Sequence, residues 1–153
     1  DWSSDVCSSD LVPFVVNDDP TLAVEAGADG VHVGQDDMPP AEARRIVGPG
    51  RLIGLSTHTR AQLLAAQRLP VDYVGFGPIF ATHSKDSPYA PLGPSELAWA
   101  LKTATLPVVP IGGIGPDTLA SLAAVGATRA AVISAAVGAD DIAAAVRALS
   151  CLL

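Results

Sequence analysis

The stretch Ala26-Gly27-Ala28-Asp29-Gly30-Val31-His32-Val33-Gly34-Gln35-Asp36-Asp37 contains the pattern that decides the fold. Small residues typical of a helix end (26–29) lead into a short apolar strand (30–33), and the strand leads into polar residues (34–37). A strand without polar alternation is typical of a parallel sheet that helices cover. The stretch therefore predicts one β-strand of an α/β fold, with a polar segment at its carboxyl end.

Similar transitions from a helix end into a strand recur at residues 69–74 and 125–130, and they precede the second, fourth and sixth expected strands. The expected strands are residues 14–16, 30–33, 52–55, 73–76, 108–111 and 130–133, and the expected helices are residues 21–26, 40–47, 60–68, 94–103, 116–125 and 142–149. Such pairwise recurrence favours a barrel over an open sheet. Because a complete (β/α)₈ barrel has eight units and about 200 residues or more, we predict an incomplete TIM barrel with about six of the eight βα units.

The composition changes sharply at Val12. Residues 1–11 are rich in Ser and Asp and show no structural period, so we interpret them as a non-native, adapter-like segment. Residues 12–153 are the expected partial-barrel domain, and the remaining units of a complete barrel would precede Val12. Cys7 and Cys151 lie near the two ends without metal-binding spacing, and we expect no disulfide or thiol function from them.

The charge balance limits the kinds of partner. The chain carries nine Lys and Arg against 16 Asp and Glu, a net charge of −7, which is unfavourable for a nucleic-acid or anionic-membrane surface. No apolar run reaches about 18 residues and no secretory leader pattern is present, so we expect a cytoplasmic protein. With 49% hydrophobic and 16% charged residues, the chain has the composition of a compact domain. Nothing in the sequence indicates an oligomeric state.

Two carboxylates follow adjacent predicted strands, at the ends where parallel α/β folds place their active sites. Asp18 follows the first strand and Asp37 follows the second. Carboxylate oxygens suit Mg²⁺, which commonly takes one or two of them and completes its coordination with water and substrate phosphate. From spacing alone a turn or helix-capping role is the better-supported interpretation of such residues. Asp19 and Asp36 are the better capping candidates.

A second group of strand-end residues suits phosphate. Gly112-Gly113 allows backbone N–H groups to approach a phosphate, and Ser134 ends the predicted sixth strand; the alternative is a tight turn. Lys85 lies with Thr82 and Ser84 in a long predicted loop. A Lys beside hydroxyl groups suits a diphosphate, and a solvated Lys is an equally good interpretation.

The three histidines are not obvious ligands or bases. His32 alternates within its predicted strand, which is typical of a hydrogen-bonded barrel residue, and His58 and His83 lie on predicted loops. For all three we expect a structural or solvated role.

Six strand-end segments follow one another along the chain: Val16-Asn17-Asp18, Gly30-Val31-His32-Val33-Gly34-Gln35-Asp36-Asp37, Gly54-Leu55-Ser56-Thr57-His58, Gly75-Phe76-Gly77-Pro78-Ile79-Phe80 with Thr82-His83-Ser84-Lys85, Ile111-Gly112-Gly113-Ile114 and Val132-Ile133-Ser134. Taken in order, they resemble those of the thiamine-phosphate synthase family, also known as thiamine-phosphate pyrophosphorylases. The resemblance covers residues 12 to about 149, and six motifs in order are far more specific than any one of them.

The resemblance implies a transferase of thiamine biosynthesis that condenses hydroxymethylpyrimidine diphosphate with a thiazole phosphate, giving thiamine phosphate and diphosphate. It implies Mg²⁺ held by Asp18 and Asp37. It also implies a pyrimidine diphosphate site formed by Asn17, Ser56 and Lys85, of which Ser56 and Lys85 are the catalytic candidates. The implied thiazole phosphate site consists of Thr82, Ser84, Gly113, Ile133 and Ser134. A metal and Lys85 would neutralise the departing diphosphate. The family usually has Thr where this chain has Ser84, a mild departure that keeps the hydroxyl.

One departure from the family pattern is serious. The family's Gln-Leu-Arg-Glu-Lys-like segment, which binds the diphosphate, has no counterpart here. We therefore expect the chain by itself to be unstable or inactive, because unpaired strand edges expose backbone and core. Two alternatives remain: a thiazole tautomerase of the same fold, and an inactive fragment that binds phosphate only. Asp18, Asp37 and Lys85 favour the synthase, since a tautomerase has no use for a metal-diphosphate site.

Overall fold

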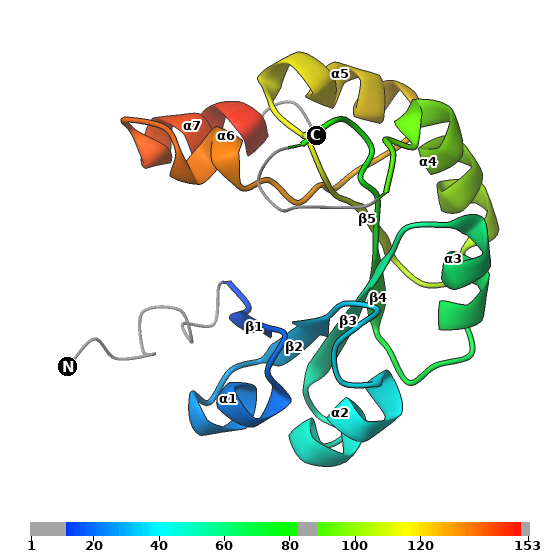
Figure 1. The fold of residues 1–153 in the computed structure, drawn as a ribbon. Helices are drawn as coiled ribbons and strands as arrows, with labels where there is room; N and C mark the ends of the chain where they lie inside the picture. The colour runs from blue at the N-terminus through cyan, green and yellow to red at the C-terminus, as the bar shows by residue number, and fades with distance from the viewer. Residues whose placement is uncertain (1–11, 83–88, 151–153) are drawn as a thin grey trace.

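The computed structural model describes residues 12–82 and 89–150. Its centre is a parallel sheet in which the strands lie in chain order. The strands are β1 (Val15–Asn17), β2 (Gly30–Val33), β3 (Leu52–Thr57), β4 (Tyr73–Phe76) and β5 (Val108–Pro110). Figure 1 shows that the strands follow an arc and that the helices lie along its outer side. This is part of the predicted (β/α)₈ barrel, with the concave side of the sheet as the barrel interior.

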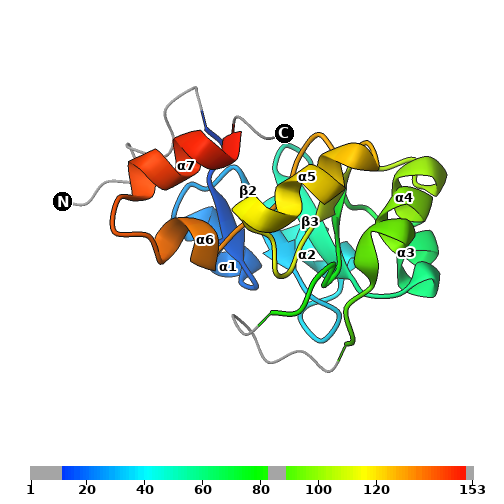
Figure 2. The same cartoon turned by 90° about the horizontal axis from the view of Figure 1, so that it is seen from above.

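The helices alternate with the strands, as predicted. They are α1 (Pro20–Glu25), α2 (Pro40–Val47), α3 (Arg60–Ala66), α4 (Gly93–Thr103), α5 (Pro116–Ala124), α6 (Ser134–Val137) and α7 (Ile142–Ser150). The predicted bounds of α2 agree with the structure, and those of the other predicted helices differ by one or two residues at an end. The short α6 was not predicted. Figure 2 shows α6 and α7 at the opposite end of the molecule from α3 and α4.

The predicted sixth strand, residues 130–133, is wrong as a strand. In the described part of the chain the segment forms no regular pairing with β5; the Ala131 N–H donates one bond to the Pro110 carbonyl at 3.0 Å. Pro110 has no N–H with which to continue the ladder, and α6 begins directly after Ile133. Residues 130–133 lie beside β5 but lack the hydrogen bonds that define a strand.

The helix-facing side of the sheet forms the core. Val31, Ile53, Val74 and Phe76 are fully buried, and they pack in one cluster with small or branched residues of the covering helices. Those helix residues are Ala23, Ala43, Leu63, Ala66, Leu97 and Ala100. Alanine at these positions allows a helix to lie close to the strands, which explains the Ala-rich spacing of the sequence.

The concave side carries the alternate residues of the same strands. His32, Gly54 and Tyr73 are partners in register across β2, β3 and β4, and Ser56 lies two residues beyond Gly54 on β3. Because successive strand residues point to opposite faces, this layer faces the barrel interior. No helix in the described part of the chain is long and apolar enough to cross a bilayer.

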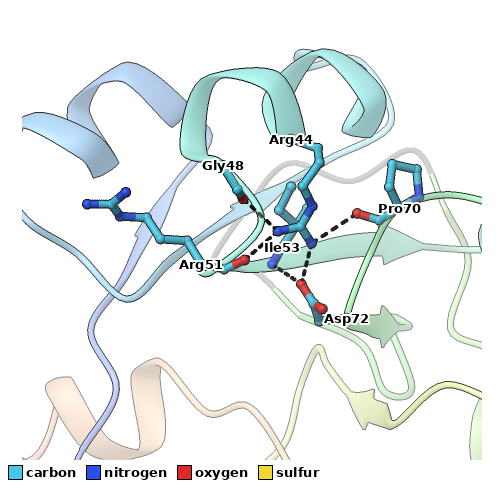
Figure 3. A network of polar contacts seen from close by, with 6 residues as sticks. All are labelled: Arg44, Gly48, Arg51, Ile53, Pro70 and Asp72. Carbon is cyan, nitrogen blue, oxygen red and sulfur yellow. Dashed lines mark hydrogen bonds and ion pairs between the residues drawn. The ribbon is translucent and has the colours of Figure 1, made fainter.

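A polar network holds the amino ends of β3 and β4 (Figure 3). Arg44 on α2 lies 2.6 Å from the Asp72 carboxylate, and the same carboxylate accepts the Ile53 N–H at 2.7 Å. The Arg44 guanidinium also donates to the carbonyl oxygens of Gly48, Arg51 and Pro70. One side chain thus links α2 to the loops that precede both strands.

Candidate functional site

The chain turns sharply where β1 ends. Asp18 has φ of 69° and is the one non-glycine residue with positive φ in the described part of the chain. Asp tolerates this left-handed conformation better than most residues do. The Asp18 N–H donates to the His32 carbonyl at 2.8 Å, so the turn stays attached to β2. The turn leaves Asn17 and Asp18 exposed at the carboxyl edge of the sheet.

Asp19 is the N-cap of α1, and the prediction of a capping role is confirmed. Its Oδ1 accepts the backbone N–H groups of Thr21 and Leu22 at 2.9 and 3.0 Å. Asp18 and Asp19 therefore have separate tasks although they are neighbours in the sequence.

The same prediction for Asp36 is wrong. The N-cap of α2 is Pro39, which makes no side-chain capping bond. The Asp36 side chain cannot take that role, because the cap is the residue directly before the helix. Asp37 instead stabilises the turn after β2, since its Oδ2 accepts the Gly34 N–H at 2.7 Å. Asp37 is otherwise exposed.

Asp18 and Asp37 fit a magnesium site better than a closed metal cage. They follow neighbouring parallel strands and both are exposed. Residues 12–82 and 89–150 contain no cluster of three or more His, Cys, Asp or Glu side chains able to hold a metal. Zinc sites need three or four such ligands, whereas Mg²⁺ accepts one or two carboxylates and fills the remaining positions with water and phosphate. The turn bond of Asp37 uses one of its two carboxylate oxygens.

Ser56 is part of a polar chain inside the barrel. Its Oγ lies 2.9 Å from His32 Nε2, and His32 Nδ1 lies 3.0 Å from the Tyr73 hydroxyl. Gln35 Nε2 donates to the Ser56 carbonyl at 2.6 Å. Burial raises the pKa of Tyr73, which keeps the phenol protonated. The predicted role of His32 as a hydrogen-bonded barrel residue is confirmed, while the contributions of Tyr73 and Gln35 were not predicted.

His58 has a structural role, as predicted. Its Nδ1 lies 2.7 Å from the Gly77 carbonyl, and its ring stacks on Tyr89 at 4.2 Å between centroids. His83 lies outside the described residues, as do Ser84, Lys85, Cys7 and Cys151. The structure therefore leaves the roles of Ser84 and Lys85 as predictions.

Thr82, Gly113 and Ser134 line one cleft, although they come from three separate segments. The cleft is open, with a volume of about 580 Å³, which lies within the range of small-molecule sites. Ile133, next to Ser134, is 57% exposed. The structure thus brings together Thr82, Gly113 and Ser134 of the predicted thiazole phosphate site, while Ile133 does not line the cleft.

Backbone hydrogen bonds join two of the segments that lead into this cleft. The Ile79 N–H donates to Ile111 O at 2.8 Å and the Phe80 N–H donates to Gly112 O at 3.1 Å, so the segment after β4 runs beside the segment after β5. Gly112 and Gly113 have φ of 86° and 65°. A Cβ on Gly113 would lie 2.8 Å from the Phe80 Cβ, and only glycine fits such a crossing.

The chain matches known proteins over most of its length. The family model described as thiamine monophosphate synthase matches residues 3–136. A thiamine-phosphate synthase of Pelotomaculum thermopropionicum is 46% identical over 142 residues, which cover 93% of this chain and 65% of that protein. A thiamine-phosphate synthase of Anaeromyxobacter dehalogenans is 50% identical over 127 residues, which cover 83% of this chain and 57% of that protein.

A solved structure shows the same fold. The thiamine phosphate pyrophosphorylase of Pyrococcus furiosus aligns with a TM-score of 0.84 at 33% identity, covering 92% of this chain and 67% of that one. The chain spans somewhat less than two thirds of the length of the two curated relatives. The strand-end geometry, the matching family model and these relatives agree, and the chain belongs to the thiamine monophosphate synthase family.

Proposed function

We propose that the chain carries part of the active site of a transferase that makes thiamine phosphate from hydroxymethylpyrimidine diphosphate and a thiazole phosphate. One observation carries the proposal. The exposed carboxylates of Asp18 and Asp37 and the cleft of Thr82, Gly113 and Ser134 belong to the same carboxyl edge of one sheet. Two anion-handling regions on one edge suit a reaction between two phosphorylated substrates.

The proposed step breaks the bond between the pyrimidine methylene carbon and the diphosphate oxygen, and the thiazole nitrogen bonds to that carbon. Diphosphate leaves with the electron pair of the broken bond, so its growing charge must be neutralised. Mg²⁺ bound by Asp18 and Asp37 would supply much of that neutralisation. No protein nucleophile or strong base is needed, which agrees with the exposed carboxylates and hydroxyls of the site.

The remaining residues have proposed binding roles. Asn17 and Lys85 hold the diphosphate, with Lys85 as a catalytic cation, and Ser56 contacts the pyrimidine. The thiazole phosphate is held by Thr82, Ser84, Gly113 and the backbone of residues 133–134. The exposed Ser134 begins α6, where helix N–H groups face outward. Small molecules in the cytoplasm, rather than nucleic acid or membranes, are the proposed partners, in keeping with the net charge of −7.

Calorimetry with each substrate separately tests the proposal. We expect the full chain to bind hydroxymethylpyrimidine diphosphate only when Mg²⁺ is present, and to bind the thiazole phosphate without the metal. Binding of the thiazole phosphate alone would contradict the synthase and favour a thiazole tautomerase. Binding of inorganic phosphate but neither substrate would favour a phosphate-binding fragment.

A further inference from the structure

The polar chain inside the barrel extends beyond the residues assigned to the reaction. His32 on β2 lies between Ser56 on β3 and Tyr73 on β4, and both of its ring nitrogens have a hydroxyl partner, at 2.9 and 3.0 Å. His32 and Tyr73 are largely shielded from solvent and their rings lie 5.4 Å apart between centroids. Ser56 therefore has a side-chain partner that can orient its hydroxyl group.

The backbone leaves room for this arrangement. Gly54 is the register partner of both His32 and Tyr73. A Cβ on Gly54 would overlap His32 Nδ1 and lie 2.5 Å from the Tyr73 hydroxyl oxygen. On the neighbouring strand a Cβ on Gly75 would approach His32 Cε1 at 3.4 Å. A side chain at Gly54 would therefore displace the imidazole, whereas a Cβ at Gly75 would only contact it.

The direction of the hydrogen bonds follows from the chemistry of the three groups. A neutral imidazole has one protonated ring nitrogen, which donates a hydrogen bond, and one unprotonated nitrogen, which accepts one. The role of one nitrogen therefore fixes the role of the other. A phenol is a stronger acid than an aliphatic hydroxyl and a weaker acceptor, so Tyr73 donates to His32 Nδ1. The proton of His32 then lies on Nε2, where it donates to Ser56 Oγ. The Ser56 hydroxyl proton is thereby directed to a different acceptor.

We propose that His32 and Tyr73 are positioning residues that make Ser56 a hydrogen-bond donor toward a ring nitrogen of the pyrimidine substrate. The part of this proposal that concerns the substrate rests on the proposed function. The direction of the hydrogen bonds among Tyr73, His32 and Ser56 depends only on the fold. An aminopyrimidine offers ring nitrogens as acceptors and an amino group as donor. A directed Ser56 hydroxyl selects the ring edge and so fixes how the pyrimidine lies in the barrel.

The first test measures the tautomer of His32. Nitrogen-15 chemical shifts of the imidazole ring distinguish the two neutral tautomers in the full chain. We expect the proton on Nε2 in the wild type and a mixture of tautomers in Tyr73→Phe, which keeps the ring and removes the phenolic donor. A wild-type proton on Nδ1, or a tautomer that Tyr73→Phe does not alter, would overturn the proposal.

The second test uses a matched pair of amides. The amide of His32→Gln can reach the position of Nε2 and donate to Ser56, whereas the amide of His32→Asn reaches only the Nδ1 position beside Tyr73. We expect the affinity for hydroxymethylpyrimidine diphosphate, measured by calorimetry with Mg²⁺, to fall by no more than about threefold in the Gln variant. In the Asn variant it should fall about tenfold, the loss of roughly one hydrogen bond.

Binding of the thiazole phosphate is the internal control, because its proposed ligands lie in the cleft of Thr82, Gly113 and Ser134. It should be unchanged in both amide variants. Equal loss of pyrimidine affinity in the two variants would mean that His32 acts through its volume alone and would refute the proposal. Absence of pyrimidine binding by the wild type would contradict the proposed function. The nitrogen-15 result would still decide the direction of the hydrogen bonds from Tyr73 through His32 to Ser56.

Discussion

The amino ends and the carboxyl ends of the strands differ in how they use polar side chains. At the amino ends, Arg44, Asp72, Gln67 and Asp29 are bonded to backbone groups of neighbouring segments. Gln67 Oε1 accepts the N–H groups of Thr105 and Leu106 and the Thr105 hydroxyl, and Asp29 Oδ2 accepts the Phe14 N–H at 2.7 Å. These bonds close loops.

At the carboxyl ends, polar side chains lie beside a cleft. Asn17, Asp18, Asp37 and Ser134 are exposed, and the cleft of Thr82, Gly113 and Ser134 opens beside the strand ends. We therefore propose that one end of the barrel stabilises the fold and the other binds ligands, as TIM barrels generally divide these tasks. Substitutions at the two ends should therefore affect different measurements.

The largest expected effect is on metal-dependent binding. Asp37→Asn keeps an oxygen for the Gly34 N–H and removes the charge, so we expect the affinity for hydroxymethylpyrimidine diphosphate with Mg²⁺ to fall by roughly 100-fold, or about 2.7 kcal/mol. Calorimetry measures this change. Asp36→Asn, an exposed neighbour, is the control and should bind as the wild type does. If Asp37→Asn bound as tightly as Asp36→Asn and the wild type, Asp37 would not be a ligand of the metal.

The next effect tests the opposite end. Arg44→Met keeps the apolar stem and removes the donors to Asp72 and three carbonyls. We expect the free energy of unfolding to fall by about 2 kcal/mol, measured by urea denaturation, with both substrate affinities unchanged in the folded protein. Arg45→Met, at an exposed position of the same helix, should change stability little. A loss of substrate affinity in Arg44→Met would break the division between the two ends.

Two glycine substitutions distinguish the effect of backbone strain on stability from an effect on ligand binding in the phosphate cleft. Gly113 and Gly126 both have positive φ, but only Gly113 has atoms close to the position of a Cβ. We expect Gly126→Ala to lower stability by about 1 kcal/mol through backbone strain, and Gly113→Ala to lower it by more, because its Cβ would also overlap Phe80. Only Gly113→Ala should weaken thiazole phosphate binding, by about tenfold. If Gly126→Ala weakened that binding as much, the cleft assignment would be wrong.

The smallest effect compares adjacent aspartates. Asp19→Ala removes the N-cap of α1 and should cost about 1 kcal/mol in the free energy of unfolding, while Mg²⁺-dependent binding stays unchanged. Asp19→Asn, which retains a capping oxygen, should restore most of that stability. Thermal unfolding and calorimetry on the same samples give both values. Loss of metal-dependent binding in Asp19→Ala would show that the two aspartates do not act separately.

Local sequence was sufficient where local physics decides the structure. The strands of Val31, Ile53 and Val74 were predicted because branched apolar runs need burial on the helix side. Asp19 was predicted as a cap because its oxygen bonds the next residues in the chain. The wrong prediction of a sixth strand shows the limit, since regular pairing there depends on Pro110, a residue of another strand, which offers no N–H.

The sequence by itself determined the order of βα units, the helix-facing core and the polar character of each strand end, because these follow from periodicity and from contacts between near neighbours. Only the tertiary structure decided which polar residues meet. Parallel register brought His32 between Ser56 and Tyr73, and the crossing of two loops brought Thr82 beside Gly113 and Ser134. Such contacts join residues far apart in the chain, and they depend on how strands align rather than on any local preference.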